Sequence, residues 1–440
     1  MKRSLLTLAC LCASVTAWAA DSAAPLGLPE AMQLAEKRSV NAVVADERVK
    51  QAVERYHQAL SLFAPRLTVE ARQERRTAQL SSMGIELPGS SGETIGPFNS
   101  FDGRFRATQL LFDLGAIERL FLVRDGKRLA EAQYEKARQD TLALVAALYL
   151  DAQRASERTR LAAAYEKRED LRLRLAHRKF RSGVATLPDL RRVKASQKKS
   201  RAFRWEARSA EIEKRQTLFS AIGLPADSTR ALDAARTQRA IGMASNDEIR
   251  SLAERSPDIA TARAALAQRE SDLRVQWAEF LPKVEAYGDY GLSGATPDDS
   301  KDTYTVGVKA SVPIFEGGMR VFKISEAESR RREVKAQLSD AEDQARIKAA
   351  ASAREAARAL ELLKASDLEL LAAAQNARVV ESRYAGGSAS LWQRIDTLTE
   401  SALADDSRSE AAASYLLSQV AFARSVGKMD DFVKNYGAAL

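Results

Sequence analysis

The sequence contains very little cysteine and very little histidine. Its two cysteines, Cys10 and Cys12, lie in the segment 1–19, and its two histidines are His57 and His177. Neither histidine has the neighbours of a zinc motif or a catalytic triad. Beyond Ala19 the chain has no thiol for a disulfide, a metal ion or nucleophilic catalysis. We therefore predict a protein that is not an enzyme and that has no cofactor or metal site.

Long apolar runs are also missing from the chain. No stretch beyond Ala19 is apolar over about 18 positions, the length expected of a membrane-spanning helix. Any part of the mature chain that crosses a membrane would therefore have to consist of strands. The formal net charge is +9. Basic residues alternate with Asp and Glu along the helices, which is typical of solvated faces, and we predict no nucleic-acid partner.

The segment 1–19 has the pattern of a signal peptide. Lys2 and Arg3 precede an apolar run from Leu5 to Val15, and Ala17-Trp18-Ala19 offers a small-residue cleavage site. The apolar run is too short for a membrane anchor. We predict export from the cytoplasm, with cleavage near Ala19.

The main positive feature of the chain is an internal repeat. The number of residues that separates a position in the first copy from its match in the second is smaller for Phe112 and Phe315 than for Pro65 and Pro282. The first copy therefore contains extra residues between Pro65 and Phe112. We place the extra length in the Gly-, Ser- and Pro-rich stretch 81–100 and expect it at the outward face. The repeating unit is much longer than a solenoid repeat. The matching pairs are Pro65 and Pro282, Phe112 and Phe315, Gly183 and Gly387, and Gly223 and Gly427.

Each copy has the same predicted order of elements: helix, strand, loop, strand, long helix, turn, helix. Residues 66–72 and 101–108 alternate between apolar and polar side chains, which predicts strands. The proline-free run 114–181 has helical apolar spacing and would form about 100 Å of helix. Single uninterrupted helices are expected at 28–63 and 247–280, and loops at 81–100 and 293–302.

These patterns predict five segments. The segments are a signal peptide at 1–19; a first repeat at 20–223 with strands at 66–76 and 101–110 and a helical tip near 183; a linker at 224–246; a second repeat at 247–427 with strands at 283–292 and 304–312 and a tip near 387; and a C-terminal segment at 428–440.

Four strands cannot close a barrel on their own, so closure would need other copies of the chain. Strands of about 10 residues with one apolar face have the length of membrane-crossing strands. A second possibility is a sheet carried on a coiled-coil stalk, which would make the protein a non-conducting trimeric structural stalk or adhesin.

The residues at the strand ends and helical tips resemble those of the TolC-like outer membrane efflux proteins. The resemblance rests on the tandem copies, on the Phe-Asp-Leu-Gly and Phe-Glu-Gly-Gly motifs that end at Gly115 and Gly318, and on the glycine-marked segments 180–186 and 384–390. It implies a mainly helical fold with a membrane β-barrel. Three chains would form a homotrimer with one 12-stranded barrel in outer-membrane lipid and a periplasmic α-barrel, in a Gram-negative bacterium. The linker and C-terminal segment would form a smaller belt.

The resemblance also implies partners and a transport function. Such channels bind a periplasmic adaptor (membrane fusion) protein and an inner-membrane RND or ABC transporter, and they conduct substrate passively. Small-molecule or drug efflux is favoured by its frequency in the family. Type I protein secretion is the alternative.

Family channels narrow at the helical tips, where carboxylates six and nine positions after the tip glycine can form rings. The residues at these positions are Asp189 and Arg192 in the first copy, and Gln393 and Asp396 in the second. A ring of Asp396 would favour cations; alternatively, Asp396 only caps or solvates its helix. The family's adaptor contacts fall on Ser182, Gly183 and Val184, and on Gly386, Gly387 and Ser388, although glycine there is also needed to turn the helix.

Overall fold

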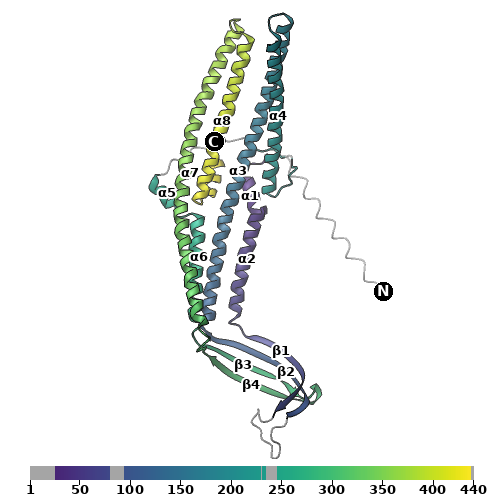
Figure 1. The fold of residues 1–440 in the computed structure, drawn as a ribbon, viewed down its shortest axis with the longest axis vertical. Coiled ribbons are helices and arrows are strands. Elements are labelled where there is room, and N and C mark those ends of the chain that lie inside the picture. Colours follow the sequence, from purple (N-terminus) through teal and green to yellow (C-terminus); the bar gives the residue numbers. More distant parts are fainter. Residues whose placement is uncertain (1–24, 80–93, 229, 234–244, 438–440) are drawn as a thin grey trace, which may run out of the picture. The chain divides into compact units, whose positions relative to one another are not determined.

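Figure 1 shows the computed structural model, which describes residues 25–79, 94–228, 230–233 and 245–437. The predicted signal peptide lies outside the described residues. The chain is mainly helical with one four-stranded antiparallel sheet, which confirms the predicted fold class of the single chain. Within the described part, no helix is both long enough and apolar enough to span a membrane.

The structure has the following elements in chain order: α1 (Leu28–Arg38), α2 (Val40–Ser61), β1 (Arg66–Gln79), β2 (Thr94–Asp113), α3 (Leu114–Arg181), α4 (Leu187–Ala221), α5 (Asn246–Ala253), α6 (Pro257–Ala278), β3 (Lys283–Gly294), the short 3-10 helix η2 (Pro297–Asp299), β4 (Ser300–Ser311), α7 (Met319–Ala385), α8 (Leu391–Ser425) and α9 (Met429–Gly437).

The chain folds into two compact units, and each unit draws on both sequence repeats. Unit 1 contains the residues up to Asp46, Gln133–Ala260 and the chain from Asp340 onward; unit 2 contains Glu47–Ala132 and Thr261–Ser339. The two repeats are therefore not two separate compact bodies.

Unit 2 contains the sheet, in the order β1-β2-β3-β4. The central β2–β3 pairing joins the two repeats. Val69 faces Phe105, Phe105 faces Tyr290, and Tyr290 faces Tyr304, so one apolar row crosses all four strands. Since cross-strand neighbours lie on the same side of a sheet, these side chains share one face.

The strands extend further than the sequence predicted. Residues 94–100 belong to β2 because Thr94 pairs with Gln79 and Ser100 with Glu74, although their composition suggested a loop. The register shifts between Arg76 and Ala78. The rest of the predicted loop, 81–93, lies outside the described residues. In the second copy, β3 reaches Gly294 and β4 begins at Ser300, so the predicted loop 293–302 is mostly strand and η2.

Both predicted opening helices are interrupted. Ser39 leaves the helical conformation (ψ 139°), and its hydroxyl accepts a hydrogen bond from the Ala42 N–H at 3.2 Å. It therefore ends α1 and caps α2. In the second copy α6 starts at Pro257, and the Ser256 hydroxyl accepts from the Asp258 N–H at 3.3 Å. Proline disfavours helix at the residue before it, so one helix cannot continue through Ser256.

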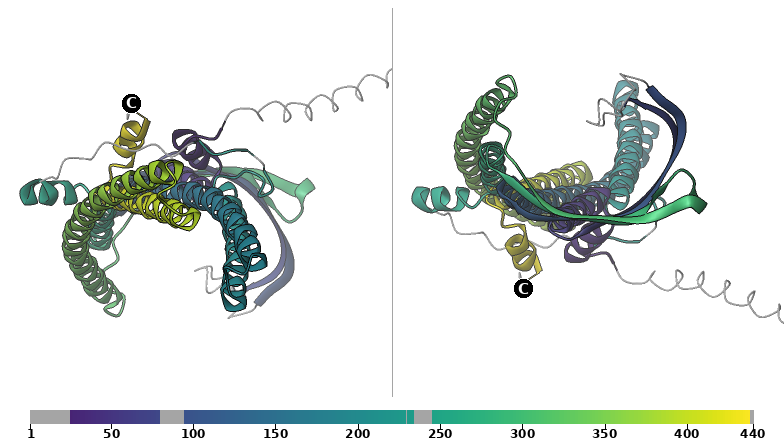
Figure 2. Two further views of the ribbon diagram at one scale, coloured as in Figure 1. Left: turned by 90° about the horizontal axis from the view of Figure 1, so that it is seen from above. Right: turned by 90° about the horizontal axis from the view of Figure 1, so that it is seen from below.

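In unit 1 the two helical hairpins, α3 with α4 and α7 with α8, lie side by side, with α8 next to α3 (Figures 1 and 2). An ion pair of 2.5 Å between Arg154 and Asp406 joins α3 to α8. Within the first hairpin, Glu166 of α3 binds Arg204 of α4 at 2.7 Å. The order across unit 1 is thus α7, α8, α3, α4.

Among the described residues, the largest hydrophobic core cluster lies where α1, α9, part of the linker and the ends of α4 and α8 pack on the middle of α3. Tyr149 is fully buried there and donates a hydrogen bond to the Leu26 carbonyl at 2.8 Å. Arg138 of α3 binds Glu36 of α1 at 2.7 Å and Asp430 of α9 at 3.0 Å. Segments from both ends of the described chain are therefore fixed to one stretch of α3.

Candidate functional site at the helical tips

Each long helix ends in the same turn. At the first tip, the Val184 N–H donates to the Lys179 carbonyl at 2.9 Å and the Gly183 N–H donates to the Phe180 carbonyl at 3.1 Å. This is a Schellman arrangement, with Gly183 at φ 73°, and Gly387 has the same place and φ 75° at the second tip. A side chain at either glycine would meet open space but would need a left-handed backbone. Glycine is thus required by the turn itself.

The six predicted adaptor contacts are all exposed. Val184 is the most apolar of them, and 73% of its surface is accessible. The two tips present corresponding residues, because the hydrogen bonds of the first turn recur at the equivalent positions of the second. The six residues are Ser182, Gly183, Val184, Gly386, Gly387 and Ser388.

The residues six positions after the tip glycines cap the returning helices. One Asp189 carboxylate oxygen accepts hydrogen bonds from the Thr186 hydroxyl at 2.6 Å and from the Thr186 N–H at 3.2 Å. The Asp189 N–H in turn donates to the Thr186 hydroxyl oxygen. Ser390 and Gln393 form the same capping box on α8. The hydrogen bonds from Thr186, together with the charge of Arg192, hold the pKa of Asp189 below its ordinary value. Both side chains are exposed, and each interacts within its own tip.

Asp396 contacts the neighbouring hairpin. Its carboxylate lies 3.2 Å from the Arg172 guanidinium of α3, and both side chains are partly exposed, 59% for Asp396 and 28% for Arg172. The Arg172 guanidinium also lies 5.3 Å from the ring centre of Trp392, and the Lys179 ammonium lies 5.0 Å from the same ring. We call Arg172, Lys179, Trp392 and Asp396 the tip cluster. It joins α3 to α8 near the ends of both hairpins.

The alternative that Asp396 only solvates its own helix is therefore incomplete, since the carboxylate has a cationic partner. That partner partly neutralises the negative charge on which the predicted ring depends. Arg192, the repeat counterpart of Asp396, is exposed on α4. Within the single chain, the contact of Asp396 is therefore with Arg172 of the other repeat.

Further contacts continue the α3–α8 link away from the tips. The Arg168 guanidinium donates to the Leu398 carbonyl at 2.7 Å, and the Ser409 hydroxyl donates to Glu157 at 3.0 Å. Sequence reasoning did not identify the α3 partners of this link. The available signal was Trp392, a tryptophan shortly after a tip glycine, followed by the charged residues Arg394 and Asp396.

Over the ranges 25–79, 94–228, 230–233 and 245–437, the structure shows no group of three or more His, Cys, Asp or Glu residues arranged to hold a metal ion.

Comparisons with known proteins agree with this architecture. The sequence matches the family model described as "Outer membrane efflux protein" over residues 31–224 and 249–428. It is 26% identical over 231 residues to the alkaline protease secretion protein AprF of Pseudomonas aeruginosa, a match that covers 50% of this chain and 47% of AprF. The chain thus matches about half the length of this curated relative.

Solved structures share the fold over nearly the whole chain. The CmeC outer membrane channel of Campylobacter jejuni matches with a TM-score of 0.78 at 15% identity, covering 94% of this chain and 89% of CmeC. The outer membrane protein VceC of Vibrio cholerae matches with a TM-score of 0.73 at 18% identity, covering 91% and 96%. The predicted resemblance is confirmed by the family match, which covers most of both repeats. The chain belongs to the outer membrane efflux protein family.

Proposed function

We propose that the chain is one subunit of a homotrimeric exit duct in the outer membrane of a Gram-negative bacterium. The duct passively conducts substrate that an inner-membrane transporter delivers through a periplasmic adaptor. The observation that carries this proposal is the exposed apolar face of the sheet. Val306 and Tyr304 on β4 are 80% and 78% exposed, values that favour contact with lipid or with another copy over contact with water.

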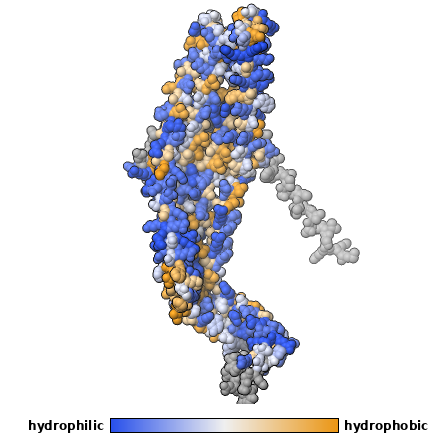
Figure 3. Space-filling model, viewed as in Figure 1, coloured by the Kyte–Doolittle hydropathy of each residue, from blue (hydrophilic) through white to orange (hydrophobic). Residues whose placement is uncertain are grey.

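The other face of the sheet is strongly charged. Arg104 of β2 binds Asp289 of β3 at 2.8 Å and also contacts Asp102, and Arg106 lies 3.7 Å from Glu70 of β1. The strand region shows this hydrophilic character in Figure 3, with apolar surface gathered where α7 begins. A sheet with one apolar and one charged face suits a wall between lipid and a water-filled pore.

The edges of the sheet support assembly. In the described chain β1 and β4 each pair on one side only. Unpaired strand edges bind further strands readily. Three copies would join β1 of one chain to β4 of the next and close a ring of twelve strands, without any further element.

The helical tips are the proposed meeting point with the adaptor, through Ser182, Gly183 and Val184 and their counterparts Gly386, Gly387 and Ser388. Asp189, Arg192, Gln393 and Asp396 would line the narrow end of the duct. The mature chain has no cysteine, so single cysteines at Val184 or Ser388 can be cross-linked selectively to the adaptor. Thr217, exposed near the other end of α4, is the matched control position. Equal cross-linking from Thr217 would contradict docking at the tips.

For the cargo, we propose small molecules, in keeping with the family description. Export of a polypeptide is a second candidate, and the partial match to a protein named for alkaline protease secretion favours it. Deleting the gene distinguishes the two. Small-molecule efflux predicts increased sensitivity to toxic compounds with normal secreted proteins, whereas secretion predicts the loss of one exported polypeptide with unchanged sensitivity.

The membrane assignment itself is tested by charge placement. Val306→Lys puts a cation on the apolar face, at an expected cost of about 2–4 kcal/mol at mid-membrane depth. Thr305→Lys is the matched control, because it adds the same charge to the opposite face of the same strand. The proposal predicts that only Val306→Lys reduces the trimer recovered from outer membranes. Equal recovery of both variants would contradict a lipid-facing sheet.

A further inference from the structure

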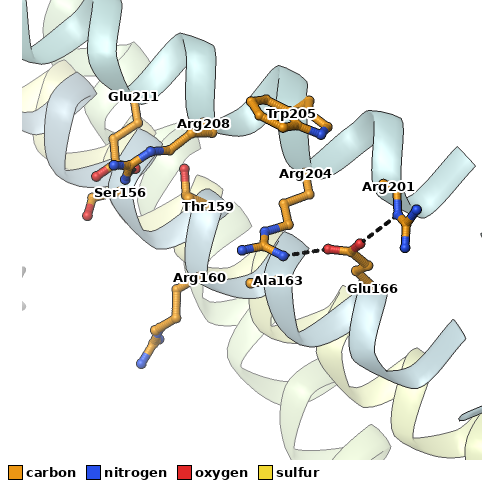
Figure 4. Close-up of a pocket in the computed structure, with 10 residues that line it drawn as sticks. All are labelled: Ser156, Thr159, Arg160, Ala163, Glu166, Arg201, Arg204, Trp205, Arg208 and Glu211. Carbon is orange, nitrogen blue, oxygen red and sulfur yellow. Dashed lines mark hydrogen bonds and ion pairs between the residues drawn. The ribbon is translucent and has the colours of Figure 1, made fainter. Parts of the chain in front are cut away.

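The first helical hairpin of unit 1 contains a groove of about 830 Å³ between α3 and α4 (Figure 4). It lies well back from the tips, beyond the tip cluster. The lining residues are Ser156, Thr159, Arg160, Ala163 and Glu166 of α3, and Arg201, Arg204, Trp205, Arg208 and Glu211 of α4.

The second hairpin has a packed hydrophobic seam at four of the ten corresponding positions, whereas Arg408 and Asp367, the counterparts of Arg204 and Ala163, form an ion pair at 2.8 Å. There Leu363 and Tyr415 are buried in one cluster with Ala359 and Ala411. When the two copies are aligned on their tip glycines, Leu363 corresponds to Thr159 of the groove.

The same kind of replacement occurs at three further positions of the groove. Tyr415 corresponds to Glu211, and Leu360 and Ala412, which pack against the second cluster, correspond to Ser156 and Arg208. Exchanging apolar side chains for polar and charged ones removes hydrophobic stabilisation from a helix pair. The hairpin fold does not need this exchange, as the second copy shows, so the exchange points to another use.

The charges of the groove are arranged around a buried carboxylate. Glu166 is buried and binds Arg204 at 2.7 Å and Arg201 at 3.2 Å. Those two guanidiniums hold the pKa of Glu166 below its ordinary value, so the carboxylate stays ionised and keeps both in place. Figure 4 shows both hydrogen bonds reaching Glu166 from α4.

The groove as a whole is cationic. Glu211 binds Arg208 at 3.2 Å, and Arg160 is exposed at the α3 side. The lining residues thus include four arginines and two glutamates. Guanidinium groups bind carboxylates with two parallel hydrogen bonds.

Trp205 gives the groove one flat apolar surface. Its side chain lies among the arginines of α4, and the residue is 73% exposed. A tryptophan this exposed on a charged helix is unusual for packing, and its ring face can stack against the apolar face of a ring.

We propose that this groove binds a carboxylate-bearing saccharide, with Trp205 stacking on a sugar ring and the arginines binding the carboxylates. The location rests on the proposed function, which places these helices in the periplasm. There the matching polymer is the cell-wall glycan, whose peptide stems carry carboxylates.

The geometry favours this ligand over an amphipathic helix of a partner protein. On α4 the lining residues span 201–211, about 15 Å, with Trp205 as their only large apolar side chain. An amphipathic helix needs apolar anchors at several successive turns. The groove offers one stacking surface and several cations instead.

The test is binding of the purified full chain to protein-free cell-wall sacculi and to a soluble disaccharide–tetrapeptide derived from them. Trp205→Ala and Arg160→Ala should each weaken binding about tenfold, the loss expected for one stacking contact or one charged hydrogen bond. Trp205→Phe should retain part of the affinity. Trp277→Ala and Lys364→Ala are the controls; Lys364 is the exposed repeat counterpart of Arg160, and both variants should leave binding unchanged.

Two further probes define the ligand class. A neutral chitin oligosaccharide should bind more weakly than the disaccharide–tetrapeptide, and added salt should weaken only the charged ligand's binding. No binding to either cell-wall ligand, equal binding by Trp205→Ala, or tighter binding of an acidic helical peptide would each overturn the inference. Single-channel conductance of the same variants should stay at the wild-type level. If the wild-type protein conducts ions but does not bind the cell-wall ligands, only this inference is contradicted. If the wild-type protein does not conduct ions, the proposed function is contradicted.

Discussion

Replacing Trp392 by alanine should loosen the link between the two helical hairpins near their tips. The change removes the ring that lies 5.3 Å from the Arg172 guanidinium and 5.0 Å from the Lys179 ammonium. At exposed sites each such cation–π contact contributes about 0.5–1 kcal/mol. The ion pair between Arg172 and Asp396 adds about 0.2–1 kcal/mol, a small value because both side chains are partly in water.

The loss of both cation–π contacts therefore amounts to about 1–2 kcal/mol, or about a 5- to 30-fold change in an opening equilibrium. Hydrogen exchange of the full chain, followed by mass spectrometry, measures this change locally. Backbone amides in the last turns of α3, from Arg172 to Lys179, should exchange faster by about that factor in Trp392→Ala.

Arg394→Ala is the matched control. Arg394 belongs to the same turn of α8 but contacts α7, through Glu381 at 2.6 Å and the ring of Tyr384 at 5.0 Å. This variant should speed exchange at the end of α7 and leave the end of α3 unchanged. If Trp392→Ala leaves exchange in α3 at the wild-type rate, the tip cluster does not hold the hairpins together.

Three other predictions concern the tips and the core of unit 1. In the proposed duct, Asp396→Ala should reduce the preference for cations, whereas Arg172→Ala should increase it by removing the cation beside Asp396. Reversal potentials across a salt gradient measure the ion preference of both variants. Shifts of the same sign in the two variants would contradict the pairing of Arg172 with Asp396. Arg138→Ala leaves Glu36 and Asp430 without their shared cation, at an expected cost of about 1–3 kcal/mol for this partly exposed group, and urea unfolding with limited proteolysis should show lower stability and easier cleavage near α9. The hydrogen bond from Arg138 holds the pKa of Asp430 below its usual value. The stability that this ion pair contributes is therefore fully present above the unfolded pKa of about 4 and is lost as the pH falls through the lower folded pKa. Between pH 6 and pH 3 the urea midpoint should drop by less in Arg138→Ala than in the wild type.

The long helices could be predicted from the sequence because their limits are local. The run 114–181 has no proline, follows a strand, and ends in a glycine turn, and α3 has these bounds in the structure. Ser39 carries no comparable signal, since the apolar spacing continues past it and its capping hydrogen bond appears only in three dimensions. At Pro257 a local signal does exist, a serine followed by proline and aspartate at a helix start.

The tips show the same division between local and distant interactions. The capping roles of Asp189 and Gln393 follow from residues three positions away. The contact between Arg172 and Asp396 joins residues from opposite repeats and depends on α8 lying beside α3. The groove around Trp205 becomes evident only when the packed seam of the second hairpin is available for comparison.

Single-channel recording tests most directly whether the chain forms a conducting duct. The purified full-length protein, shown to be trimeric by its native mass, is added to a planar lipid bilayer. The proposed function predicts discrete conductance steps whose cation preference falls in Asp396→Ala. A folded trimer that inserts into the bilayer and gives no conductance, in the wild type and in Trp392→Ala alike, would contradict the duct and favour a structural stalk.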